Sequence, residues 1–91
     1  MKAVKVNALP GYKLQVTFDD GISGVIDLNE LVKIGIFSPL QNQELFSKAF
    51  TTGYSIAWSE ELEIDAVAIY AEIVNKNPED ILSDTLVYAA N

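Results

Sequence analysis

Alternating apolar and polar residues predict β-strands at the start of the chain. In residues 2–9, Val4, Val6 and Ala8 fall on one side and polar residues on the other. This period of two is typical of a strand with one buried face. Pro10-Gly11 follows directly and predicts a turn.

The clearest strand is the stretch YKLQVTF at residues 12–18, in which every second side chain is large and apolar. Its inward-facing residues would be Tyr12, Leu14, Val16 and Phe18. Asp-Asp-Gly at residues 19–21 predicts a tight hairpin loop, because glycine adopts a positive φ without strain. A returning strand over residues 22–26 would complete a three-stranded antiparallel meander.

Capping signals predict two short helices after the meander. Asp27 and Glu30 stand three residues apart, the spacing of a capping box, and Gly35 would end the first helix. Ser38 would cap the second helix, with Pro39 at its first position. The apolar side of this second helix would hold Leu40, Leu45, Phe46 and Phe50.

The rest of the chain predicts one more strand and two more helices. Residues 51–59 return to alternation, which would place Tyr54, Ile56 and Trp58 on one face, with Trp58 in the core. Asp65 would cap a helix from residue 66 to about 75.

Asn77-Pro78 would start the last helix, so a C-terminal helical layer is expected over residues 77–91. We therefore expect an α+β fold with an N-terminal meander, short helices, a further strand or strand pair, and that helical layer. At 91 residues the chain is expected to form a single domain, 1–91.

The composition lacks cysteine, histidine and arginine. Without histidine or cysteine, acid–base or nucleophilic catalysis would need carboxylates, lysines or tyrosines with strongly shifted pKa values. Without arginine, and with a net charge of −7, direct binding of nucleic acid is not expected. No apolar run has the length of a signal peptide or a membrane span, so we expect a cytoplasmic protein without membrane contact.

The negative charge lies in the second half of the chain. Residues 1–48 hold five lysines and five acids, whereas residues 49–91 hold one lysine and eight acids. The densest stretch, WSEELEID at residues 58–65, has carboxylates at Glu60, Glu61, Glu63 and Asp65. Two interpretations are open: a solvated turn before a helix, whose positive end favours acids, or an acidic surface for a partner.

A calcium site is the third interpretation of these acids, and the sequence argues against it. Glu61, Glu63, Asp65 and Glu72 have the relative spacing of calcium-loop positions 1, 3, 5 and 12. However, Ala66 stands where the loop needs a glycine, and the next residues continue a helix. We therefore expect no metal ligand here, and no motif predicts a cofactor.

The helix predicted from AVAIYAEIV, residues 66–74, is apolar around nearly its whole circumference, and only Glu72 interrupts it. The sheet would cover one face, and the other face needs the C-terminal helix, a second copy or another protein. The candidate apolar contacts with such a partner are Tyr70, Ile73 and Val74.

Three stretches together resemble a known family: YKLQVTFDDGISGVIDLNELV, LFSKAFTTGYSIAW and LEIDAVAIY. Their order and spacing resemble the bacterial domain-of-unknown-function family 2442 (DUF2442) over residues 1–74, which would be the family-like core. The tryptophan is followed by SEEL, where family members often have a Pro-Asn-Gly-like turn. The matching positions are Tyr12, Leu14, Phe18, Gly21, Asp27, Leu28, Phe46, Gly53, Trp58, Asp65 and Tyr70.

The resemblance implies a binding role rather than a reaction. The family has no assigned catalytic residues, and members are commonly encoded beside another small protein, in arrangements that resemble toxin–antitoxin pairs. Some members continue into a helix-turn-helix domain, which these 91 residues do not include, so DNA binding is not carried over.

Together these features favour a non-enzymatic protein–protein interaction module, as the acidic member of a toxin–antitoxin-like pair. The carboxylates of residues 60–65 would attract a small basic protein, and Tyr70, Ile73 and Val74 would supply apolar contacts. A homodimer is the alternative assembly. Alternative functions are an accessory subunit of a DNA-binding regulator and a carboxylate-based metal-binding domain.

Overall fold

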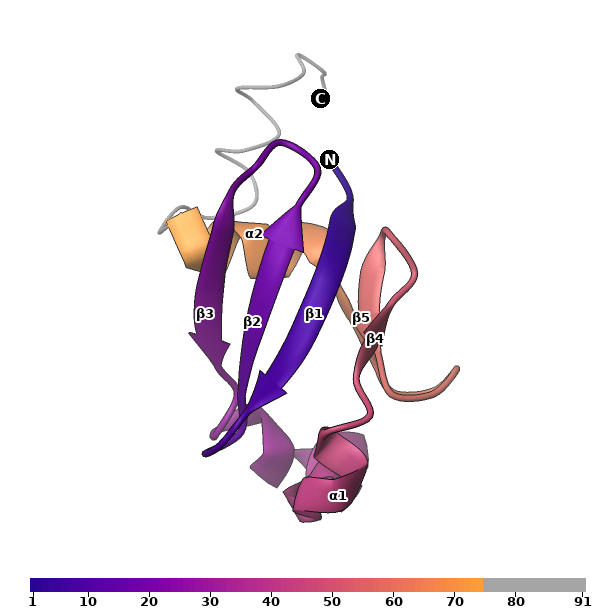
Figure 1. The fold of residues 1–91 in the computed structure, drawn as a ribbon. Coiled ribbons are helices and arrows are strands. Elements are labelled where there is room, and N and C mark those ends of the chain that lie inside the picture. The colour runs from indigo at the N-terminus through magenta and orange to yellow at the C-terminus, as the bar shows by residue number, and fades with distance from the viewer. Residues whose placement is uncertain (75–91) are drawn as a thin grey trace.

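The computed structural model describes residues 1–74 and has the expected α+β architecture. Strands β1 (Ala3–Leu9), β2 (Lys13–Phe18) and β3 (Ser23–Asp27) form an antiparallel sheet in the order β1-β2-β3. Figure 1 shows helix α2 (Ala66–Val74) lying across the back of this sheet, and short helical turns below its lower end. The meander prediction is therefore confirmed, with β3 shifted by one residue from its expected range.

A β-bulge corrects the predicted facing of the first strand. Ala3 pairs with Phe18 and Lys5 with Thr17, so Val4 is the extra residue on β1. The bulge turns Ala3 into the core, 2% exposed, and leaves Val4 55% exposed. From Val6 onward the alternation runs as expected, because Val6 again pairs with the buried Val16.

Tyr12 lies in the first turn rather than in β2. Gly11 and Tyr12 both have positive φ, 80° and 61°, so the chain reverses here before the strand begins. The Tyr12 ring packs edge-on against Phe46, with centroids 5.4 Å apart, and its hydroxyl donates to the carbonyl of Gln41. These contacts favour a conformation that a non-glycine residue seldom adopts.

The predicted helices of residues 27–50 are shorter and capped differently. Asp27 accepts from the Asn29 amide at 2.8 Å, but Glu30 makes no capping bond, so the expected capping box is absent. Glu30 instead pairs with Lys33 at 3.6 Å on the surface. The chain forms two 3-10 segments, η1 (Leu31–Lys33) and η2 (Gly35–Gln41), so Gly35 opens η2 as well as following the first helix.

The cap of the next helix is Asn42 and not Ser38. Ser38 and Pro39 lie inside η2, and α1 (Gln43–Phe46) follows. The Asn42 side chain accepts from the amides of Glu44 and Leu45 at 2.9 and 3.3 Å, which stabilises the first turn of α1. Phe50 was expected on the apolar side of this helix, but it lies beyond the helix and is 47% exposed.

The single strand expected over residues 51–59 is two strands of a second antiparallel sheet. Strands β4 (Phe50–Thr51), β5 (Ser55–Ala57) and β6 (Glu63–Asp65) follow the order β4-β5-β6. Gly53, at φ 98°, makes the turn between β4 and β5. Tyr54 therefore lies in a turn, 67% exposed, rather than beside Ile56 and Trp58 in the core.

The two sheets and the helices share one hydrophobic core. The Ala3 amide donates to the Gly53 carbonyl at 2.8 Å, which fastens β1 to the turn after β4. Trp58 is 7% exposed, as the sequence predicted, and its indole nitrogen donates to the Phe46 carbonyl at 2.9 Å. The fully buried side chains that build the core include Leu14, Val16, Phe18, Val32, Leu40, Phe46 and Ile56.

Helix α2 begins as expected, with the Asp65 side chain accepting from the Val67 amide at 2.9 Å. Within residues 1–74, no helix has both the length and the apolar character needed to span a bilayer. The expected C-terminal helical layer, residues 77–91, lies outside the described residues.

Gly24 on β3 sets how closely α2 approaches the meander. A Cβ atom at Gly24 would lie 2.6 Å from Cγ2 and 3.4 Å from Cβ of Ile73. Because a β-branched side chain in a helix has one strongly preferred rotamer, Ile73 cannot swing away cheaply. The helix and the strand therefore fit only when one of these two residues is small.

We predict that Gly24→Ala lowers the free energy of unfolding by about 1–3 kcal/mol, the usual cost of overpacking. Urea denaturation would measure this loss. Adding Ile73→Ala should make the alanine at position 24 better tolerated, so the two substitutions should couple favourably in a double-mutant cycle. An unchanged urea midpoint for the single variant would contradict the close approach.

Candidate functional site

The acidic stretch forms a tight hairpin between β5 and β6. Trp58 donates to the Leu62 carbonyl at 2.8 Å, and the Ser59 hydroxyl accepts from the amides of Glu61 and Leu62 at 3.3 and 3.2 Å. These bonds hold the turn and leave its carboxylates outside. Glu60 and Glu61 lie on the turn, and both are exposed.

The other two carboxylates lie on β6, an edge strand of the second sheet. Glu63 and Asp65 are exposed, whereas Ile64 between them is half-buried. The Trp58 amide donates to the Leu62 carbonyl, and the Ala66 amide donates to the Tyr54 carbonyl. Residues 62 and 66 therefore direct their backbone groups toward the β5 side, and every second residue between them does the same. The backbone groups of Glu63 and Asp65 therefore point away from β5. The four acids of the sequence prediction thus share one border of the molecule.

In the described part of the chain, no carboxylate of this border forms an ion pair. Among residues 1–74, the ion pair present is Lys33–Glu30, outside the border. Glu63 and Asp65 line a shallow hollow with Thr52, Tyr54 and Ser55. Lys2 lies over the Tyr54 ring at 5.4 Å, a cation–π contact that accounts for this exposed aromatic residue.

The chain after Asp65 does not follow the path of a calcium loop. Residues 66–74 form α2, so the chain after Asp65 runs straight where a calcium loop would wrap around the ion. Within residues 1–74, no group of three or more acidic side chains is placed to hold a metal. Glu72 lines a different pocket from Glu63 and Asp65.

The expected apolar contacts on α2 lie partly against the protein's own sheet. The Tyr70 ring packs edge-on against Phe18, with centroids 4.9 Å apart. Ile73 packs over Gly24. Tyr70, Ile73 and Val74 are all half-buried, so each keeps part of its surface open.

Tyr70 also forms a hydrogen bond that the sequence did not predict. Its hydroxyl donates to Asp20 Oδ2 at 2.5 Å, from α2 to the β2–β3 hairpin loop. This bond, together with the Ile22 amide, holds the pKa of Asp20 below its ordinary value. The same bond, and partial burial, raise the pKa of Tyr70.

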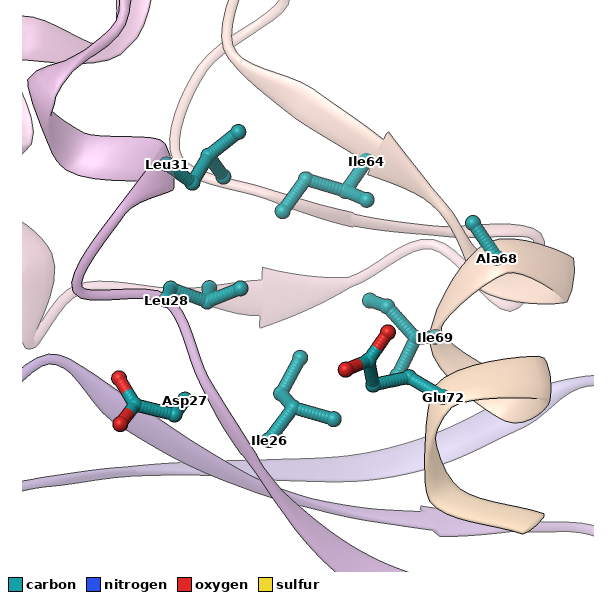
Figure 2. A pocket seen from close by; sticks show the side chains of 8 residues that line it. All are labelled: Ile26, Asp27, Leu28, Leu31, Ile64, Ala68, Ile69 and Glu72. Carbon is teal, nitrogen blue, oxygen red and sulfur yellow. The ribbon is translucent and has the colours of Figure 1, made fainter. Parts of the chain in front are cut away.

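A second pocket was missed by the sequence analysis because its residues come from four separate elements of the chain. Figure 2 shows aliphatic side chains from the end of β3 and the start of η1 facing others from β6 and α2. The pocket holds about 180 Å³. Its lining residues are Ile26, Asp27, Leu28, Leu31, Ile64, Ala68, Ile69 and Glu72. The sequence signal for it was Glu72, the single charge in an apolar helix.

We predict a pH-dependent stability difference between the wild type and Tyr70→Phe. A carboxyl whose pKa falls on folding stabilises the protein above its ordinary pKa of 3.8. That contribution is lost as the pH falls through the lowered folded value. Tyr70→Phe should therefore cost about 0.5 kcal/mol at neutral pH, the low end for a solvent-facing hydrogen bond, and nothing once Asp20 is protonated.

Urea unfolding at a series of pH values would measure this difference, with Tyr54→Phe as the matched control. The Tyr54 hydroxyl makes no hydrogen bond within residues 1–74, so its removal should leave the pH profile unchanged. At alkaline pH the raised pKa of Tyr70 matters instead. The stability that the Tyr70 hydroxyl contributes is complete below pH 10.0 and is lost as the pH rises through the raised pKa. A Tyr70→Phe difference that persists at low pH would show that Asp20 is not the acceptor that matters.

We also predict that calcium or magnesium leaves the melting temperature unchanged relative to a chelator. A ligand that binds only the folded state raises the melting temperature, so even weak binding at the acidic border would be visible. Differential scanning calorimetry of the full chain is the measurement. A rise that is removed by changing Glu61 and Glu63 to glutamine would restore the metal interpretation.

Comparison with known proteins supports the family resemblance. The family model described as "Protein of unknown function (DUF2442)" matches residues 3–75, most of the chain and nearly all of the described fold. That description assigns no enzymatic activity. No curated protein and no solved structure matches the chain. With its meander, second sheet and α2 all inside the matched range, this chain belongs to the DUF2442 family.

Proposed function

We propose that this protein is a non-enzymatic interaction module that binds a small basic protein, as the acidic member of a toxin–antitoxin-like pair. The observation that supports this proposal is the acidic border: Glu60, Glu61, Glu63 and Asp65 are all exposed, and none pairs with a cation in residues 1–74. Like charges held side by side raise the energy of the unbound protein, and a basic partner would relieve that repulsion.

The border sits on a strand edge, where charge also decides which partner is favoured. Exposed edge strands invite pairing with another strand, and charged side chains there discourage it. A second copy would bring its own Glu63 and Asp65 against this edge in any symmetric pairing, so like charges oppose a homodimer here. A basic strand or loop would meet no such repulsion.

The titratable groups support a non-enzymatic role. The described pair with shifted pKa values, Asp20 and Tyr70, is shifted away from neutrality in both directions. A general acid or base works best with a pKa near the working pH, so this hydrogen bond stabilises the fold rather than preparing a proton transfer. The absence of histidine and cysteine from the whole sequence agrees with this view.

In this proposal the acidic border speeds and orients the encounter, and apolar surface supplies the lasting contact. The open parts of Tyr70, Ile73 and Val74 are proposed to contribute to that contact. Long-range attraction is screened over about 8 Å at physiological salt, so the association rate should fall as salt is added.

We predict that changing Glu60, Glu61 and Glu63 to lysine abolishes capture of a small basic protein from the native cell extract. The matched control changes Asp19, Glu30 and Glu44 to lysine, which raises the net charge equally but lies outside the border. Mass spectrometry would identify the bound proteins. The purified partner would then be titrated against the wild type and both variants at rising salt.

The expected result is one basic protein that is held by the wild type and the control and is lost from the border variant. Its association rate with the wild type should fall several-fold between low and physiological salt. If both variants lose the basic protein equally, net charge and not the acidic border explains the binding. Salt-insensitive binding, or no specific partner, would remove the acidic border from the account of function.

A further inference from the structure

The pocket between the end of β3, β6 and α2 combines an apolar interior with a negative rim. Ile26 and Ile69, at its base, are only 3% and 2% exposed, and Leu28, Leu31 and Ile64 are half-buried around them. Ala68 and Glu72 are exposed and lie one helical turn apart on α2. The pocket is therefore a continuation of the core that opens beside a carboxylate.

The charges at this pocket are of one sign. In Figure 2 the Glu72 carboxylate points toward the aliphatic side chains, while Asp27 stands at the other end with its carboxylate turned outward. Both acids line the pocket, and no lysine of residues 1–74 does. A cation placed beside Glu72, which is exposed, would form an ordinary surface ion pair with it.

The size of the pocket indicates one side chain rather than a cofactor or metabolite. A volume of about 180 Å³ is well below the roughly 300–1,000 Å³ of sites for drug-sized ligands. An apolar cavity of about 150 Å³ is known to accept benzene. A leucine-sized or phenylalanine-sized group therefore fits this space.

We propose that this pocket receives one large apolar side chain of the basic partner, with a neighbouring lysine or arginine of the same partner segment bound by Glu72. This inference rests on the proposed function, because it takes the basic partner as given and assigns the place where it is held. The acidic border on β6 and the pocket share that strand: Glu63 and Asp65 face outward, while Ile64 lines the pocket. Because these side chains alternate, a partner segment would pass over the exposed edge of β6 to contact both.

Charge argues against two other occupants of the pocket: residues 75–91 of this chain and a second copy of the protein. The remaining residues of this chain, 75–91, contain one lysine but three carboxylates, at Glu79, Asp80 and Asp84. A second copy carries a net charge of −7. Neither complements a rim formed by Glu72 and Asp27 as well as a basic segment does.

The test uses methyl NMR spectra of the full chain with short peptides as probes. The first probe is Lys-Leu-Lys with blocked ends. The second, Lys-Gly-Lys, lacks the apolar group, and the third, Glu-Leu-Glu, reverses the charge. We expect saturable shifts of the Ile64 and Ile69 methyl signals with millimolar Lys-Leu-Lys, and no such shifts with either control peptide.

Three variants locate the binding. Ala68→Phe places a ring at the exposed mouth of the pocket and should abolish the shifts without touching the buried core. Glu72→Gln removes only the charge and should weaken binding about threefold, the usual effect of one exposed ion pair. Glu44→Gln, an exposed glutamate on α1, is the matched control and should bind like the wild type.

Several outcomes would overturn the inference. These are the absence of methyl shifts, equal shifts with Glu-Leu-Glu, or wild-type affinity in Glu72→Gln. Contacts from residues 75–91 to the Ile64 methyls, seen as nuclear Overhauser effects, would show that the chain fills its own pocket. Methyl shifts that depend on protein concentration would assign the pocket to a second copy.

The peptide titration and the capture experiment can fail independently of each other. If Lys-Leu-Lys shifts the backbone amide signals of Glu60, Glu61 and Glu63 but not the Ile64 and Ile69 methyl signals, the acidic border binds cations and the pocket inference fails alone. If the pocket binds the peptide as expected but no basic protein is captured by the acidic border, the proposed function fails and the pocket chemistry stands.

Discussion

The buried hydrogen bond from the Trp58 indole to the Phe46 carbonyl joins the two halves of this small fold. Trp58 directly follows β5, whereas Phe46 ends α1, and their ring centroids lie 5.7 Å apart at a 33° tilt. The Tyr12 ring, in the turn before β2, also packs against Phe46. Because an unpaired indole N–H in a core is costly, the second sheet must dock where that carbonyl lies. The direction in which β5 and then β6 leave the core follows from this bond.

The position of the acidic border follows from the same constraint. With β5 buried on both faces, the hairpin after Trp58 must turn outward, and Ser59 tightens that turn. Its carboxylates reach water without any desolvation cost. Asp65 then caps α2, so the strand that presents the acids also starts the helix that covers the meander. Gly24 lets that helix approach closely, which brings Tyr70 to Phe18 and Asp20.

Local sequence signals predicted the meander, its glycine turn at Gly21, the buried tryptophan and the cap of α2, because each depends on neighbours within a few residues. The bulge at Val4 was missed, since it depends on where Phe18 and Gly53 hold Ala3. Tyr54 was misplaced because apolar alternation outweighed the turn signal of Gly53. The caps at Ser38 and Glu30 failed where short 3-10 segments replaced the expected α-helices. The sequence indicated which acids form the border, but not that Glu63 and Asp65 lie on an edge strand.

The pocket illustrates a more general limit, because its apolar residues resemble ordinary core when the sequence is considered one segment at a time. Ile26, Leu28 and Ile64 each fit a strand or helix face, and the pocket forms only where β3, η1, β6 and α2 pack together. Asp27 and Glu72 are the exceptions, because both are exposed carboxylates at the edge of the pocket. In the proposed complex, Glu72 would pair with a cation of the partner. The pocket and the acidic border then form one surface around β6, with charge on its outer side and apolar space on its inner side.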